Sequence, residues 1–138
     1  MRETLYVKTL VRVALPATVL DDDEATNGTT VDLGVFGNDF RTVMFVVQTG
    51  TVTDGTHAFT LEESVNGTDW TAVPAARVQG VLPTVAAAHD DAVFSFGYIP
   101  STQQYVRCVV TSASTTTGGV IGAVAVCSEG SNSPVARS

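Results

Sequence analysis

With 138 residues, the chain is long enough for one domain with a substantial core and too short for two. Hydrophobic residues make up 44% of it and charged residues 15%, a balance that excludes a disordered acidic segment. The formal net charge is −7, with 14 acidic and 7 basic residues, so we expect no nucleic-acid partner, because phosphate contacts need clustered lysine and arginine.

The N-terminal part of the chain carries polar residues throughout. It lacks the apolar block of a signal peptide, and no apolar run approaches the ~20 residues that span a bilayer, so we expect cytoplasmic synthesis and no membrane partner. The stretch 4–15 alternates loosely, which predicts a strand or an extended arm within residues 1–13. A polar loop at 21–30 and a short strand or bulge at 31–37 follow.

Two strands are predicted around a two-residue turn at 54–55. Residues 41–52 (RTVMFVVQTGTV) form a continuous β-branched apolar run, typical of a strand covered on both faces. Asp-Gly at 54–55 favours a hairpin into 56–64, where His57, Phe59, Leu61 and Glu63 share the core face. Glu62 and Glu63 must then point to opposite faces, so they cannot act as a catalytic pair.

Asn66-Gly67 predicts the next turn, after which we expect Trp70 to pack near Phe59 or Leu61. Residues 75–91 read as an irregular excursion, and strand patterns return at 93–100, 103–111 and 120–127. A tight turn at 115–119 would place Cys108 opposite Cys127. This leaves a disulfide or two reduced core thiols, of which we expect the thiols.

The polar tail at 128–138 is expected to fray. About seven or eight short strands, joined by Gly, Asn, Asp and Pro turns, predict one all-β domain over residues 1–138. Its architecture should be an antiparallel β-sandwich or a flattened barrel.

Candidate chemistry is sparse. His57 lies on a predicted strand, His89 precedes two aspartates, and no serine has the spaced glycines of a nucleophile elbow. The acidic run 21–24 lacks the alternating spacing of a calcium loop, so a solvated loop is expected. Trp70, Tyr98 and Tyr105 are the candidates for a sugar-stacking platform. We expect no catalytic residues, no cofactor and no metal.

The segments 41–73, 97–111 and 115–126 together resemble the head decoration (cement) proteins of tailed bacteriophages. The resemblance lies in the pattern of turns and strands. It implies a β-sandwich on the capsid exterior, bound to the major capsid protein and often trimeric, which would make the chain a homo-oligomeric virion protein that stabilises the shell. The same pattern fits a tail or head–tail junction protein, and sandwiches also serve as carbohydrate-binding modules.

An extended N-terminal arm would be a candidate capsid contact. It could add a strand to a neighbouring sheet, with backbone hydrogen bonds giving affinity and alternate side chains filling pockets. The side chains expected to make that contact are Leu5, Tyr6, Val7, Leu10 and Val11. The alternative is that this segment forms the first strand of the chain's own sandwich.

Overall fold

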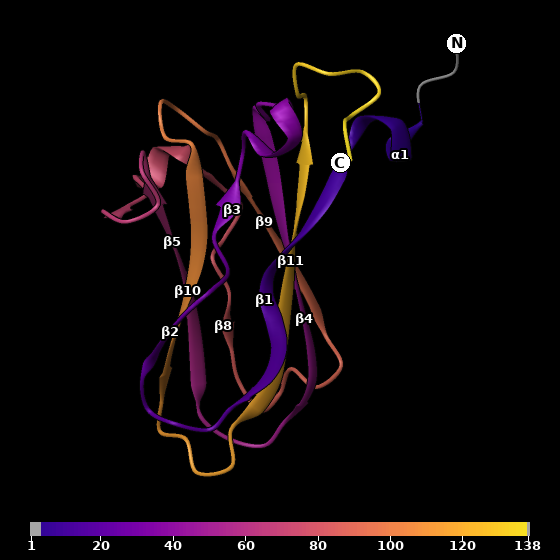
Figure 1. Cartoon of the computed structure of the whole chain (residues 1–138). Coiled ribbons are helices and arrows are strands. Elements are labelled where there is room, and N and C mark those ends of the chain that lie inside the picture. Colours follow the sequence, from indigo (N-terminus) through magenta and orange to yellow (C-terminus); the bar gives the residue numbers. More distant parts are fainter. Residues whose placement is uncertain (1–3, 138) are drawn as a thin grey trace.

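The computed structural model describes residues 4–137, which form two antiparallel sheets packed face to face (Figure 1). This confirms the predicted all-β sandwich, and the sheets do not close into a barrel. Sheet A has the order β1 (Leu10–Leu20), β11 (Gly119–Ser128), β4 (Thr42–Val52), β9 (Val93–Tyr98) and β7 (Val78–Gln79). Sheet B has the order β2 (Ala25–Asn27), β10 (Tyr105–Ala113), β5 (Thr56–Ser64) and β6 (Thr71–Ala72).

Short elements complete the described part of the chain. Strand β3 (Val31–Asp32) pairs with β10, and β8 (Thr84–Val85) pairs with β5. The helical turns are α1 (Leu5–Lys8), η1 (Val35–Gly37) and η2 (Ala75–Arg77). The strands that exceed the seven or eight expected have only two or three residues and lie in stretches that the sequence pattern leaves irregular. No helix within residues 4–137 has the length and apolarity needed to cross a bilayer.

The core is built by alternation along the long strands. In β4, Val43, Phe45 and Val47 are buried between the sheets, and the Phe45 ring stacks on Phe96 of β9 with centroids 5.4 Å apart. The intervening side chains of β4 point out of the sandwich, and Met44 is exposed. The prediction that this strand is covered on both faces is therefore wrong within residues 4–137, because alternate residues of β4 face away from the second sheet and Met44 remains exposed.

Two turns predicted to form hairpins instead connect one sheet to the other, and we call these connections corners. Asp54-Gly55 joins β4 of sheet A to β5 of sheet B, and the 114–118 connection joins β10 of sheet B to β11 of sheet A. Both connections contain a glycine at positive φ, 85° at Gly55 and 75° at Gly118. The same backbone conformation suits a hairpin turn and a connection between sheets. The Asp54 carboxylate accepts backbone N–H bonds from Thr116, Thr117 and Gly118, which fastens the two corners together.

The Asn66-Gly67 hairpin is confirmed by the pairing of β5 with β6. The expected position of Trp70 is wrong. Its ring lies under the guanidinium of Arg107, 4.2 Å from the ring centroid, and Arg107 in turn binds Glu62 at 2.7 Å. Because Glu62 points out of the sandwich, Trp70 covers the outer face of sheet B and does not pack near Phe59 or Leu61, which lie in the core.

The cysteines are two buried free thiols, which confirms the expected core thiols. Cys108 lies on β10 and Cys127 on β11, so they belong to different sheets and are not cross-strand partners. The predicted register fails because the 115–119 turn is a corner between sheets. Burial raises the pKa of Cys108 to about 11 and that of Cys127 to about 12.

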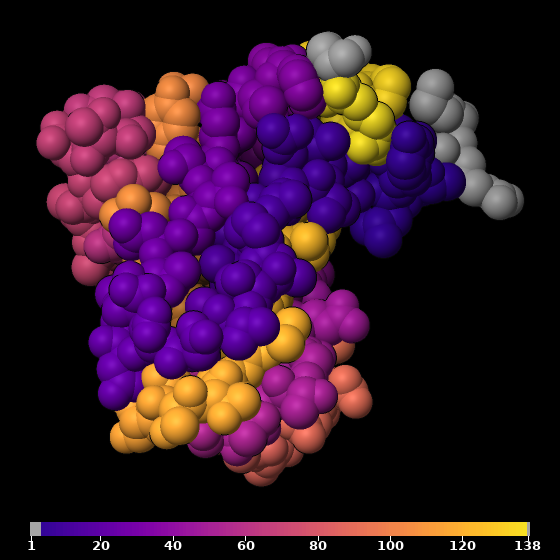
Figure 2. Space-filling view, turned by 60° about the horizontal axis from the view of Figure 1, so that its bottom comes forward, coloured from indigo at the N-terminus to yellow at the C-terminus, as the bar shows by residue number. Residues whose placement is uncertain are grey.

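The first and last described segments of the chain lie together at one end of the sandwich (Figure 2). Residues 5–8 form the helical turn α1, and strand pairing begins at Leu10, which lies opposite Cys127 of β11. The C-terminal segment contacts the body of the sandwich at Val135. Val135 is buried, and its N–H donates to the Val7 carbonyl at 2.9 Å. Residues 1–3 of the predicted arm and 138 of the predicted tail lie outside the described residues.

Candidate functional site

The two histidines occupy separate structural positions. His57 is fully buried on β5, where its Nδ1 lies 2.8 Å from Oγ of Ser112 and its Nε2 lies 3.3 Å from the Asp54 carbonyl oxygen. His89 accepts the backbone N–H of Ala86 on Nδ1 at 3.0 Å and sets its ring edge-on to Phe94. Each histidine is therefore engaged by its own surroundings, and the structure does not bring them together.

The pairing of His57 with Ser112 was missed from sequence. The two residues are 55 positions apart and become neighbours because β5 pairs with β10 in a register that sets one opposite the other. Only knowledge of that register could have revealed the pair. Within residues 4–137, both side chains are buried and hydrogen-bonded beneath the Asp54 corner, so the pair serves the packing there.

The acidic run 21–24 forms the loop between β1 and β2. The Asp23 carboxylate accepts bonds from the hydroxyl (2.6 Å) and the backbone N–H (2.8 Å) of Thr115, and these two bonds lower the pKa of Asp23. In the part of the chain that the structure describes, no group of three or more His, Cys, Asp or Glu side chains is placed to hold a metal ion. The carboxylate of Asp23 is thus used to fasten a loop.

The three aromatic residues considered for sugar stacking do not form a common platform. Tyr98 is buried in the core, and its hydroxyl donates to Oε1 of Glu63 at 2.7 Å. Trp70 has one ring face covered by Arg107, and Tyr105 lies at the end of β10 near Gly67. This arrangement counts against the carbohydrate-binding alternative.

A buried polar cluster joins the two sheets. Glu63 on β5 of sheet B accepts bonds from Tyr98 on β9 of sheet A and from both terminal nitrogens of Arg77, which ends η2. Burial raises the pKa of Glu63, but the hydrogen bonds from Arg77 and Tyr98 and the charge of Arg77 outweigh it and hold that pKa below its usual value. The cluster is fully satisfied and has a structural role.

The first candidate adhesive surface is the α1 turn, residues 5–8. Leu5 and Tyr6 are 76% and 71% exposed, whereas Val7 is partly covered and Leu10 is buried. Arg137 holds the turn in place: its guanidinium stacks 3.9 Å from the Tyr6 ring centroid and donates to the carbonyls of Tyr6 and Thr9. Of the five predicted contact residues, Leu5 and Tyr6 are thus presented at this end, and Val11 is exposed on sheet A.

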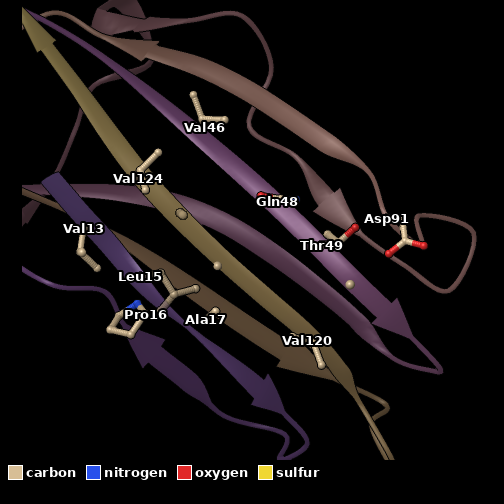
Figure 3. A pocket seen from close by; sticks show the side chains of 13 residues that line it. Val13, Leu15, Pro16, Ala17, Val46, Gln48, Thr49, Asp91, Val120 and Val124 are labelled. Atoms are coloured by element: carbon tan, nitrogen blue, oxygen red, sulfur yellow. The ribbon is translucent and has the colours of Figure 1, made fainter. Parts of the chain in front are cut away.

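The second candidate surface is the outer face of sheet A, which we call the valine face. Its exposed apolar side chains come from four neighbouring strands and are Val11, Val13, Val19, Met44, Val93, Val120 and Val124. A hollow of about 480 Å³ lies on this face among Val13, Val120 and Val124 (Figure 3). Its floor is low because Gly50 and Gly122 have no side chains and Ala17 has a short one.

Comparison with known proteins supports the fold. No protein-family model and no curated protein sequence matches the chain. The crystal structure of the SPBc2 prophage-derived protein YomS is similar over 87% of this chain and 93% of that one, with a TM-score of 0.50 and 13% identity. The crystal structure of PirA gives a TM-score of 0.38 at 13% identity, over 93% of this chain and 97% of that one. At this identity the likeness to YomS concerns the sandwich alone.

Proposed function

We propose that this chain is a non-enzymatic structural protein of a tailed-phage particle. In this proposal it binds the major capsid protein on the outside of the shell after synthesis in the host cytoplasm. Three features support the proposal: the resemblance of the strand and turn pattern to head decoration proteins, the fold shared with a prophage-derived protein, and the α1 turn. The α1 turn is the observation that carries it.

The α1 turn presents two apolar side chains that are not buried in the core of the chain itself. An isolated helix of four residues is unstable in water, because it cannot offset the cost of nucleation. Here the C-terminal segment stabilises it through Arg137 and Val135, yet Leu5 and Tyr6 remain in solvent. A side chain that is already ordered loses less entropy on binding, so this turn is suited to insert into a pocket of a partner.

A shell-binding role also fits the energetics of many weak contacts. One projection that carries Leu5 and Tyr6 gives a small interface. If the bound copies bridge several shell subunits, dissociation of one subunit must break several contacts at once, so modest single contacts stabilise a shell. The net charge of −7 suits a position on the exterior, away from packaged nucleic acid.

The proposal is tested by cosedimentation of the full chain with purified heads and, separately, with purified tails of the phage that carries the gene. Both particles are prepared from a mutant that lacks this protein. We expect the wild-type chain to pellet with heads and the double variant L5S/Y6S to bind at least tenfold more weakly. The matched control is V81S, which changes an 83% exposed valine in the loop between β7 and β8.

Each result has a defined meaning. Circular dichroism must show that L5S/Y6S stays folded. Tyr6→Ser removes the stacking of Arg137 on the ring but leaves the hydrogen bonds from Arg137 to the carbonyls of Tyr6 and Thr9, so the melting temperature should fall only slightly. Pelleting with tails alone would replace the head role by a tail or junction role, and pelleting with neither would refute a virion role. Equal binding of L5S/Y6S and wild type to heads would show that the α1 turn is not the contact.

A further inference from the structure

The strands that form the valine face carry far fewer charged residues than the rest of the chain. Arg12 is the only charged residue within β1, β11, β4 and β9, and its guanidinium lies over the Phe36 ring, 5.6 Å from the centroid. The chain's other acidic and basic residues lie outside these four strands, and they give the molecule its charge of −7. Two copies therefore repel each other in most orientations, and the valine face is where they can meet without opposing like charges.

From this charge distribution, together with the shape of the face, we propose that the valine face binds a second copy of this chain across a two-fold axis. Such a contact is isologous, so the same side chains serve on both sides. The inference concerns a different surface from the α1 turn and does not depend on the proposed function.

The relief of the face suits pairing with a copy. The hollow at Gly50 and Gly122 lies beside the ridge formed by Val13 and Val124, so the ridge of one copy can enter the hollow of the other, and the reverse. A Cβ at Gly122 would lie 3.1 Å from Cα of Ala17, which shows how closely the bulged part of β1 approaches β11 there. Packed sheets interdigitate their side chains in this manner, at a separation of about 10 Å.

Asp91 is the one charged residue that lines the hollow, and it lies at the end away from Val124 (Figure 3). An axis near Val124 would place the Asp91 carboxylates of the two copies on opposite sides of the axis. They would then remain in the solvated rim of the interface, where charges cost little.

The size of the face is sufficient for a specific contact. A strand of about ten residues is about 33 Å long, and four neighbouring strands are about 19 Å wide. The projected area is thus about 600 Å², close to the about 800 Å² that each partner buries in a standard interface. These dimensions predict a reversible dimer that depends on protein concentration.

The edge strands of sheet A disfavour pairing between two copies, so the valine face is the remaining surface of this sheet. Strand β1 at one edge of sheet A is bulged on both sides of Leu15 and contains Pro16, and the carbonyl of Ala14 already accepts the N–H of Thr29 at 2.8 Å. Strand β7 at the other edge has only two residues. Bulges, proline and short edge strands all prevent the addition of a neighbouring strand.

The test measures the mass of the full chain in solution by light scattering and analytical ultracentrifugation, from about 1 to 100 µM. We expect twice the 14.4 kDa chain mass at the higher concentrations. Val124→Lys places a charge at the centre of the valine face and should raise the dimer dissociation constant at least tenfold. The matched control Val65→Lys changes an exposed valine in the β5–β6 hairpin and should leave it unchanged.

A second variant keeps the test valid if Val124→Lys fails to fold. Val124→Thr has nearly the same shape and β-propensity, so it should fold and weaken the dimer to a smaller extent. A wild-type chain that stays monomeric at 100 µM would overturn the inference, as would a trimer. A dimer whose dissociation constant is the same in wild type and both Val124 variants would overturn it as well. Because the assay contains no phage particle, it separates this inference from the proposed function.

Discussion

Replacing Arg77 by methionine would leave the carboxylate of Glu63 inside the sandwich without its cation. The Glu63 side chain is 4% exposed and that of Arg77 is 23% exposed. In the wild type, Glu63 accepts a bond from Nη1 of Arg77 at 2.7 Å and one from the Tyr98 hydroxyl at 2.7 Å. Methionine preserves most of the apolar stem of Arg77, so the change removes charge and hydrogen bonds and little packing.

The magnitude follows from the burial of the carboxylate. Removal of one partner of a buried ion pair costs about 3–5 kcal/mol, since the remaining charge has lost the group that compensated its desolvation. The Tyr98 hydroxyl still donates to Glu63, so we expect the lower part of that range, about 3 kcal/mol. For a chain of this length, that corresponds to a drop in melting temperature of roughly 10 °C.

The dependence on pH gives a test that a simple packing defect would fail. In the wild type the pKa of Glu63 is depressed, so its contribution to stability is present above the unfolded-state pKa and is lost as pH falls through the folded-state pKa. Without Arg77, burial becomes the dominant influence and should raise that pKa above its unfolded value. The destabilisation of Arg77→Met relative to wild type should therefore shrink as the pH is lowered from 7 to 4.

The assay is urea unfolding followed by circular dichroism at each pH, with Glu63→Gln/Arg77→Met as the companion variant. The double variant has no buried charge, so it should be less destabilised at pH 7 than the sum of its single changes. A destabilisation of Arg77→Met that is equal at pH 7 and pH 4, or additive with Glu63→Gln, would refute the reasoning about an isolated carboxylate.

Two further predictions concern the corners between the sheets. Asp54→Asn removes the anionic acceptor of three backbone N–H groups, and these bonds lower the pKa of Asp54. The substitution should therefore reduce the urea midpoint at pH 7. Its effect should shrink on acidification, as the wild-type carboxylate becomes protonated. Asp22→Asn, in the exposed acidic loop, is the control, and equal midpoints for the two variants would contradict this role. Gly118→Ala and Gly37→Ala both place alanine at a φ of 75°, but a Cβ at Gly118 overlaps a neighbouring carbonyl whereas none lies within 4 Å at Gly37. Gly37→Ala should cost about 1 kcal/mol and Gly118→Ala more than about 2 kcal/mol, measured by thermal unfolding, and similar costs would rule out crowding as the cause.

The sequence was sufficient to predict local structure and the direction of side chains. Alternation in 56–64 placed Phe59 and Leu61 in the core and set Glu62 and Glu63 on opposite faces, as the structure confirms. Asn-Gly at 66–67 predicted the β5–β6 hairpin for a physical reason, the positive φ that such a turn requires. These features depend on neighbours along the chain, so they can be read from a single sequence.

The partner of each strand could not be predicted in this way. Asp54-Gly55 has the composition of a hairpin turn, yet the chain changes sheets there, because its flanking strands find better partners in β11, β9 and β10. Turn chemistry fixes the backbone angles at one point and leaves the next pairing open. For the same reason the Glu63 cluster could not be predicted. Arg77 lies in a stretch that has no helical or strand periodicity, and Tyr98 lies in a strand of the opposite sheet.

The sequence predicts residues 41–52 to be covered on both faces, and the face that is not covered belongs to the valine face. Their sequence has the composition of a strand that is covered twice. The 120–127 strand beside it is also apolar on both faces, with its valines on the outer face and Ile121, alanines and Cys127 on the inner one. Within the described chain each strand is covered once, by sheet B. A surface strand under no constraint from a partner would gain solubility from polar residues at Met44, Val120 and Val124, as the charged strands of sheet B do at Glu62 and Arg107. The second cover that the composition anticipates must then come from outside the chain, and a copy that carries the same uncharged face supplies it.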